Sequence, residues 1–258
     1  MLIKTTTQCQ QHCSHCMEEA TLEGRHMSLD VYRRALKFAE AIEGPARERI
    51  GYNRLMLSGG EPTQNPEIAA MIELAFLHGF MPTLLTNGLW LHHKDLRDRI
   101  LKYPDLLVQV TNDSRFYKLK PPVVDDPRIA YVDSLTVMIP LGRFAGQVHP
   151  ELPTRRGPSC FNLRSATRAL GDVREAVFQA RAKTYAGFSG HCTPSVCVDG
   201  SVVMGESRLC RKVGDVDTSM ETLTANIINT GSCNRCGLEE TLADQYREAI
   251  ALKGTSDD

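Results

Sequence analysis

Short apolar runs alternate with helical patterns along the first half of this chain, and this alternation restricts its fold more than any other feature. Strands that alternate with helices at such spacing are typical of βα units around a parallel sheet. Five units are too few to close an eight-stranded barrel. The sequence therefore predicts an α/β fold with a partial, open TIM-like (β/α) barrel. The five expected strands cover residues 2–6, 55–57, 81–85, 106–110 and 135–139.

The expected helices set three regions apart. Ser28 is suited to cap a first helix, which Gly44-Pro45 should end. Further helices are expected over 68–79, 91–103, 165–182 and 238–252, with a hairpin around Asp199-Gly200. The predicted regions are a barrel over 1–141, a linker and helix over 142–190, and a Cys-rich module over 191–258.

Composition gives no support for a nucleic-acid or membrane partner. The 258 residues carry 30 basic and 31 acidic side chains, a net charge of −1, which gives no support for a nucleic-acid partner. The mean hydropathy of −0.25 and the lack of an 18-residue apolar run argue against a membrane span. The N-terminus shows no secretory pattern, so we expect a cytoplasmic protein.

Nine cysteines are unusual for a reducing compartment. Three of them form the pattern Cys9-x3-Cys13-x2-Cys16 in the loop after the first strand. Three thiolates so close together suit one side of a 4Fe–4S cube and leave its fourth iron open to a ligand. The alternative is a zinc knuckle, for which His12 or His15 would have to supply the fourth ligand.

A second motif, Gly59-Gly60-Glu61-Pro62, follows the second strand. Two glycines at a strand end allow the backbone to approach a small ligand closely, although an ordinary turn would have the same composition. Together, the two motifs resemble the radical SAM superfamily. The resemblance covers residues 1 to about 140 and departs from the family pattern at His15, where an aromatic residue is usual.

The resemblance implies a 4Fe–4S cluster on Cys9, Cys13 and Cys16 with S-adenosylmethionine on its open iron. Reductive cleavage of that cofactor would give a 5′-deoxyadenosyl radical that takes hydrogen from a substrate. A flavodoxin- or ferredoxin-like reductant is the expected partner. No residue is assigned a catalytic role. The residues expected to bind the cofactor are Gly59, Gly60, Glu61, Thr86, Asn87, Thr111 and Asp113.

The second cysteine group resembles the SPASM/twitch auxiliary-cluster module of that superfamily. Its ligands would be Cys192, Cys210, Cys233 and Cys236, with Cys197 as a rival for Cys192. Four thiolates suit a second 4Fe–4S cluster or a structural zinc ion. Cys160 and the spare thiol at 197 are expected to be small buried side chains.

The substrate is left open between a peptide or protein side chain and a small molecule, in a net oxidation that could use the auxiliary cluster. An alternative of another class is a non-catalytic iron–sulfur protein for electron transfer or sensing, with a structural zinc tail. The Gly-Gly-Glu-Pro segment argues against this alternative, since an electron carrier needs no strand end that binds an amino acid.

Overall fold

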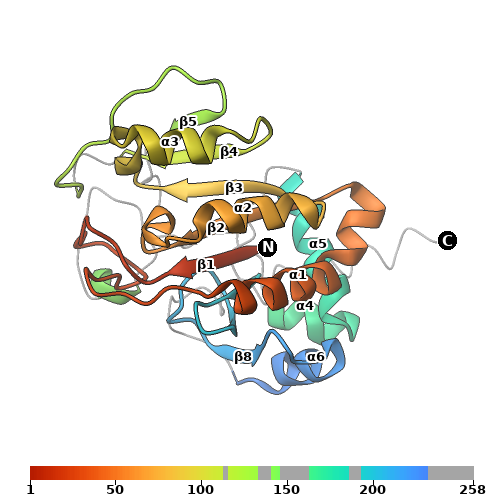
Figure 1. The fold of residues 1–258 in the computed structure, drawn as a ribbon. Coiled ribbons are helices and arrows are strands. Elements are labelled where there is room, and N and C mark those ends of the chain that lie inside the picture. Colours follow the sequence, from red (N-terminus) through yellow and green to blue (C-terminus); the bar gives the residue numbers. More distant parts are fainter. Residues whose placement is uncertain (113–115, 133–140, 146–162, 186–192, 232–258) are drawn as a thin grey trace.

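The chain folds around one sheet of eight strands in the order β5-β4-β3-β2-β1-β6-β7-β8. The structure, a computed structural model, describes residues 1–112, 116–132, 141–145, 163–185 and 193–231 (Figure 1). Strands β1 to β6 run parallel, whereas β7 and β8 are antiparallel to their neighbours. The sheet is therefore open at both edges, which confirms the predicted α/β fold with an open parallel sheet.

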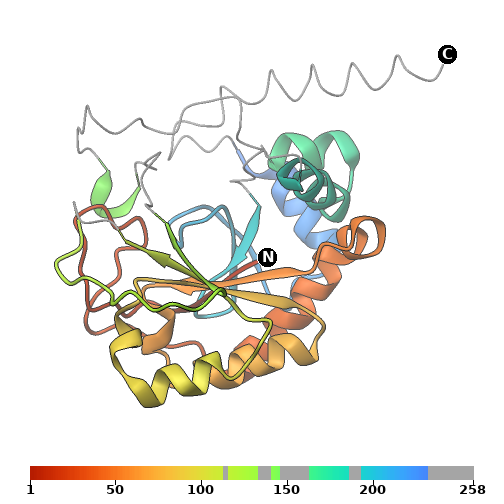
Figure 2. The same ribbon diagram turned by 90° about the horizontal axis from the view of Figure 1, so that it is seen from above.

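The parallel part of the sheet carries its helices on one face, as Figure 2 shows from above. Apolar side chains from both layers form the main core; those of Leu36, Ile42, Leu57 and Ile72, for example, are wholly buried. The elements of this part are β1 (Leu2–Thr6), α1 (Leu29–Ile50), β2 (Arg54–Gly59), η1 (Pro62–Gln64), α2 (Ile68–Leu77), β3 (Met81–Thr86), η2 (Leu89–His92), α3 (Lys94–Leu101), β4 (Leu107–Thr111) and β5 (Ile129–Val132).

Helix α1 begins where the sequence predicts and ends later. The Ser28 hydroxyl accepts a hydrogen bond from the Val31 amide and caps the helix. The helix continues through Gly44-Pro45 to Gly51, whose φ of 64° closes it. The helix has buried partners on both sides of Pro45, because α1 packs along α5 (Val173–Tyr185): Glu43 pairs with Arg181, and Ala46 lies in one buried cluster with Phe178. Tertiary packing thus outweighs the local cost of the proline.

Two further predictions for this half of the chain differ from the structure. The strand next to β4 is β5 at 129–132, which the sequence did not indicate; the expected strand at 135–139 lies outside the described residues. The single helix expected over 91–103 is instead a 3-10 turn, η2, followed by the short α3.

The second half continues the sheet from β1. It comprises η3 (Gly142–Phe144), α4 (Leu163–Leu170), α5 (Val173–Tyr185), β6 (Pro194–Val196), β7 (Ser201–Met204), β8 (Lys212–Asp215) and α6 (Met220–Asn229). The predicted hairpin is confirmed, with Gly200 at a φ of 84° between β6 and β7. The helix predicted over 165–182 is two helices, because Gly171 at a φ of 71° breaks it. Strand β8 and α6 were not predicted.

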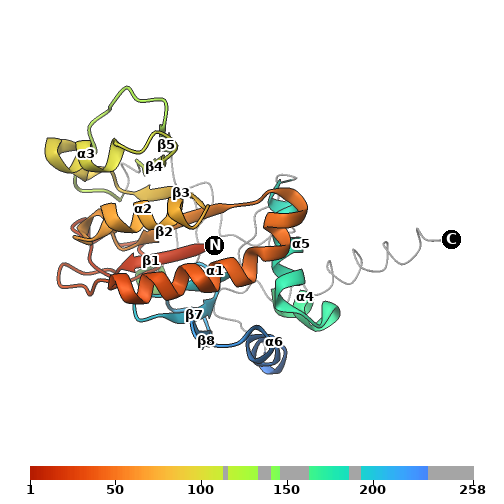
Figure 3. The ribbon, with the colours of Figure 1, turned by 45° about the vertical axis from the view of Figure 1, so that its right-hand side comes forward.

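The loops after β1, β2, β3 and β4 meet at one edge of the sheet, on the left in Figure 1, while α4 and α5 lie towards the other end, as Figure 3 also shows. Carboxyl ends of parallel strands are the usual place for an active site in such folds. Among the described residues, no helix is both long and apolar enough to cross a membrane.

Candidate functional site

The three cysteines of the first group line one cavity at the carboxyl ends of the parallel strands. The loop that carries them leaves β1 and is anchored where the Cys9 amide donates to the Thr21 carbonyl at 2.8 Å. The cavity has a volume of about 230 Å³. Its walls are formed by Cys9, Gln11, Cys13, His15, Cys16, Ala20, Ser58, Gly60, Leu85, Thr86, Asn87, Gln109, Thr111 and Tyr117.

Arg143 holds the backbone of the cysteine loop. Its Nε donates to the Cys13 carbonyl at 2.8 Å, its amide donates to the Cys16 carbonyl at 3.1 Å, and its Nη1 donates to the Ala20 carbonyl at 2.9 Å. The carbonyls of the last two cysteines and of Ala20 are therefore all held by one residue. No sequence pattern indicates this contact, because Arg143 lies 130 residues away from Cys13.

The Gly-Gly segment approaches the backbone of the same loop. The Gly60 amide donates to the Thr6 carbonyl at 2.7 Å. A Cβ at Gly60 would lie 2.2 Å from the Gln8 carbonyl oxygen, and one at Gly59, with a φ of 132°, would lie 2.2 Å from the Thr6 carbonyl oxygen. Only glycine fits at these two positions.

Glu61 is wholly buried beneath the cavity and does not line it. Its Oε1 accepts from the Thr63 amide at 3.2 Å, the Thr63 hydroxyl at 2.6 Å and the Thr86 hydroxyl at 2.7 Å. Its Oε2 accepts from the Asn87 amide at 2.7 Å. Burial raises the pKa of this carboxyl, and the four hydrogen bonds oppose the shift. The carboxylate thus ties the end of β3 to the Gly-Gly-Glu-Pro segment.

Asn87 connects Glu61 to the cysteine loop. Its Nδ2 lies 3.8 Å from the Cys9 sulfur and donates to it, while its Oδ1 accepts from the Leu89 amide at 3.0 Å. Burial raises the pKa of Cys9, and it raises that of Cys13 to about 12. A bound metal would therefore have to displace the thiol protons, as metal–thiolate sites do.

The donor set suits a 4Fe–4S cluster with one open iron. Three thiols face one cavity whose opposite wall is backbone, amide and hydroxyl, and a small polar ligand on the open iron would find hydrogen-bonding partners there. Among the described residues, no three His, Cys, Asp or Glu side chains are grouped as ligands of a single metal ion.

Aromatic side chains form the part of the cavity that sequence reasoning missed. The His15 ring lies 4.3 Å from the Phe116 ring and 6.2 Å from the Tyr117 ring, measured between centroids. Burial raises the pKa of Tyr117, so its phenol stays neutral, and a hydrogen bond from the Thr111 hydroxyl reaches it. The Gln11 amide Nε2 donates to the Leu119 carbonyl at 2.5 Å, which holds this segment against the loop.

Of the residues predicted to bind the cofactor or cluster, seven line this cavity: Cys9, Cys13, Cys16, Gly60, Thr86, Asn87 and Thr111. Gly59 and Glu61 lie behind its wall. Four other predicted residues lie outside the described part of the chain, as does Cys160: Asp113, Cys192, Cys233 and Cys236. Cys210 is described.

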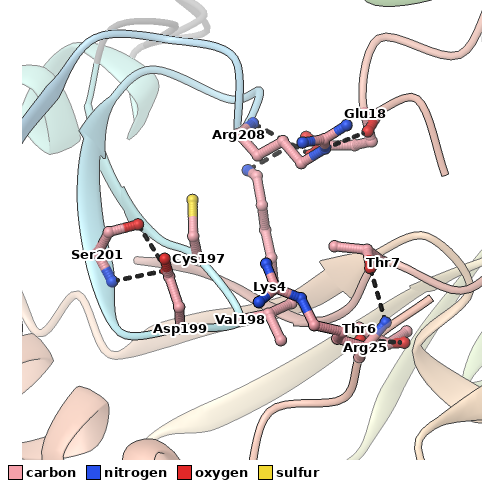
Figure 4. A pocket seen from close by; sticks show the side chains of 10 residues that line it. All are labelled: Lys4, Thr6, Thr7, Glu18, Arg25, Cys197, Val198, Asp199, Ser201 and Arg208. Atoms are coloured by element: carbon pink, nitrogen blue, oxygen red, sulfur yellow. Dashed lines mark hydrogen bonds and ion pairs between the residues drawn. The ribbon is translucent and has the colours of Figure 1, made fainter.

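A second, smaller cavity of about 120 Å³ lies between β1, the loop that follows it, and the turn that joins β6 to β7. Figure 4 shows Lys4 reaching from β1 towards Glu18 and Arg208, with the Cys197 sulfur pointing into the same space. Cys210 is not in its wall. Its amide donates to the Ser207 carbonyl at 2.9 Å, which places this predicted ligand in a tight turn after β7.

Comparison with known proteins agrees with this geometry. Residues 3–122 match the sequence model of the Radical SAM superfamily. This segment is a radical SAM domain. It comprises the cysteine loop, the Gly-Gly-Glu-Pro segment and the ends of β3 and β4, the same segments that form the first cavity.

The radical SAM domain is also similar to part of a curated relative, the PqqA peptide cyclase of Ruegeria pomeroyi. The two are 32% identical over 91 residues, which cover 35% of this chain and 23% of the relative. The chain thus matches under a quarter of that protein's length.

Solved structures with a similar arrangement include anSMEcpe with bound AdoMet, at a TM-score of 0.48 and 12% identity, covering 95% of this chain and 83% of that chain. SuiB of Streptococcus suis bound to S-adenosylmethionine has a TM-score of 0.47 and 10% identity, covering 93% and 71%. At TM-scores below 0.5, no residue role is transferred from either protein.

Proposed function

We propose that this protein is a radical SAM enzyme that holds a 4Fe–4S cluster on Cys9, Cys13 and Cys16 and binds S-adenosylmethionine in the first cavity. The observation that carries the proposal is the meeting of three thiols with Gly60, Asn87 and Thr86 around one space at the carboxyl ends of the strands. When bound, the reduced cluster supplies the electron that cleaves the cofactor, so that hydrogen can be taken from a substrate.

The chain's own residues position and shield this chemistry. Gly59 and Gly60 bring the backbone close to the loop, and Ser58, Thr86 and Asn87 present polar groups beside it. Tyr117, with its neutral phenol, and Thr111 form the far wall and would face the nucleoside end of a cofactor whose amino-acid end lies at Gly60. Asp113 is proposed as a further cofactor contact.

Residues 191–258 are proposed to form a SPASM/twitch-like module after a barrel over 1–141 and a connecting region over 142–190. Cys192, Cys210, Cys233 and Cys236 would hold a second 4Fe–4S cluster, with zinc as the alternative. Cys210 is half-buried in its tight turn, and this supports a ligand role for that residue. A net oxidation would use this cluster as the electron acceptor.

A peptide is the proposed substrate class, because the curated relative that matches the radical SAM domain is described as a peptide cyclase. A flavodoxin- or ferredoxin-like protein would supply the electron. The substrate class is tested by adding peptide fractions and small-metabolite fractions to the anaerobic enzyme. Stimulation of 5′-deoxyadenosine release by the metabolite fraction alone would refute the peptide assignment.

The activity itself is tested by anaerobic reconstitution and measurement of 5′-deoxyadenosine released with a strong reductant. Cys13→Ala should abolish release, whereas Cys197→Ala, which removes a buried thiol outside the first cavity, should retain it. No release from a wild-type chain with a loaded first cluster would favour the electron-transfer alternative.

Metal analysis of the Cys9, Cys13 and Cys16 to Ala triple variant tests the second site. About four irons per chain would establish an auxiliary cluster, and about one zinc with no iron would make the module a structural zinc site.

A further inference from the structure

A buried ionic contact joins the end of the cysteine loop to the turn that carries Cys210. Lys4, on β1, is 2% exposed, and its ammonium lies 3.3 Å from the Glu18 carboxylate and donates to the Glu206 carbonyl. Glu18 follows Cys16 by two residues, and Glu206 precedes Cys210 by four. One lysine on the central strand therefore contacts both segments.

Arg208 connects the same two segments directly. Its amide donates to Glu18 Oε2 at 3.1 Å and its Nε donates to the Glu18 carbonyl at 2.6 Å. Its Nη2 reaches Glu19 Oε2 at 3.2 Å. The two residues lie 190 positions apart in the sequence, so these contacts are made only in the folded chain.

Ser207 adds a third contact and also shapes the turn. Its hydroxyl donates to the Met17 carbonyl at 2.6 Å and accepts from the Leu209 amide at 3.1 Å, while its own carbonyl accepts from the Cys210 amide. The turn that carries Cys210 is therefore built on the three residues after Cys16.

Stability alone does not account for this arrangement. Burying a lysine and a glutamate costs hydration energy that their attraction only partly returns, and apolar side chains of the same size would often stabilise a fold as well or better. An ion pair with further hydrogen bonds, however, is satisfied in one geometry only. Figure 4 shows the side chains of Lys4, Glu18 and Arg208 converging at the wall of the second cavity.

We propose that Lys4, Glu18 and Arg208 are positioning residues that hold the Cys9–Cys16 loop in register with the Cys210 turn. The proposal rests on the function proposed above, since it assigns these residues to the site of the first cluster. Disturbing the contact shifts the segment that follows Cys16 and so weakens binding of S-adenosylmethionine to the open iron. Supporting residues behind metal ligands commonly change affinity by about 10–100-fold when replaced.

The test is a titration of the reduced, anaerobically reconstituted full-length chain with S-adenosylmethionine, followed by electron paramagnetic resonance. A cluster with an open iron changes its spectrum when a ligand binds there, whereas a cluster on four thiolates has no such position. Glu18→Gln should weaken the apparent affinity by about tenfold or more. The matched control is Glu19→Gln, which should stay near wild type, because the Glu19 side chain is 42% exposed and its contact within the described residues is with Arg208.

A second pair of variants separates positioning from stability. The double variant Lys4→Met/Glu18→Met removes both charges and nearly keeps the side-chain volumes. Its melting temperature should therefore return towards that of the wild type, while its affinity for S-adenosylmethionine stays weakened. Recovery of both would show that the contact only stabilises the fold and would overturn the proposal, as would wild-type affinity in Glu18→Gln.

If Glu18→Gln does not fold, Arg208→Lys takes its place, because a lysine keeps the charge but lacks the Nε–H group that donates to the Glu18 carbonyl at 2.6 Å. Arg208→Lys should weaken the affinity, with Arg34→Lys on the exposed ion pair with Asp217 as its control. Equal affinities in the two would overturn the proposal. A wild-type spectrum that does not respond to S-adenosylmethionine would refute the proposed function, and this inference with it.

Discussion

Replacement of Glu61 by glutamine distinguishes two roles for this residue. In one, the carboxylate contacts the cofactor directly; in the other, which the structure favours, it acts through Asn87 and Thr86. The carboxylate is wholly buried and accepts four hydrogen bonds, three at Oε1 and one at Oε2. A glutamine side chain has one acceptor oxygen, and its NH₂ group would face the Asn87 amide, which is also a donor.

The magnitude follows from these contacts. The variant keeps the hydrogen bonds at the amide oxygen, loses one to a charged acceptor, and leaves the Asn87 amide without a partner. Such a change costs about 2–4 kcal/mol of unfolding free energy. For a chain of this size that corresponds to a fall of roughly 5–15 °C in Tm. The released Asn87 would also lose its contact to the Cys9 sulfur.

The assay compares Tm of the metal-free chain with the affinity of the reconstituted chain for S-adenosylmethionine. Action through Asn87 predicts that both fall in Glu61→Gln, whereas direct contact predicts weaker binding with an unchanged Tm in the metal-free chain. Glu67→Gln, an exposed neighbour, is the control. An unchanged Tm would refute the reasoning from hydrogen bonds.

Three other positions give equally defined expectations. Gly60→Ala should abolish cofactor binding because the new Cβ meets the Gln8 carbonyl at 2.2 Å, whereas Gly44→Ala, with open space around it, should not; titration of the cofactor measures both. Glu43→Gln should cost about 3–5 kcal/mol at pH 7, since Arg181 stays buried without a counterion. Burial opposes ionisation of Glu43, but Arg181 and the Met1 amino group hold its pKa at about 2, so wild-type Tm should fall as pH drops from about 4.5 towards 2, with a shallower fall in the variant. Tyr117→Phe should weaken cofactor binding by a few-fold and Tyr117→Ala by about tenfold, because an aromatic contact such as that with His15 is worth about 0.5–1.5 kcal/mol; equal effects would show that the ring does not contribute.

The regular parts of the fold followed from local patterns because their determinants are local. Strands β1 to β4 contain short apolar runs with buried side chains, and their predicted positions are confirmed to within a residue or two. The end of α1 was wrong for the opposite reason. Gly44-Pro45 is a strong local stop signal, and the contact between Glu43 and Arg181 that overrides it joins residues 138 positions apart.

Strand β5 shows a second kind of limit. Residues 129–132, Ile-Ala-Tyr-Val, follow a segment that contains three prolines, and their apolar pattern is too short to indicate a strand. The neighbouring strand determines the structure of this segment, because residues 129–132 pair along the outer edge of β4, from Val108 to Thr111. An edge strand of this kind is defined by the neighbour that receives it.

The candidate site also combines residues that local motifs indicate with residues that only long-range contacts bring together. Cysteines and glycines could be named from the sequence because their chemistry is required wherever they occur in such motifs, and seven predicted residues do meet in one cavity. Arg143, Tyr117 and the contact of Lys4 with Glu18 and Arg208 could not, since arginine, tyrosine and lysine are common at surfaces and carry no signal in isolation. What marks Lys4 is its burial, which only the fold reveals. A cysteine motif thus specifies which atoms bind the metal, and residues distant in the sequence hold those atoms in place.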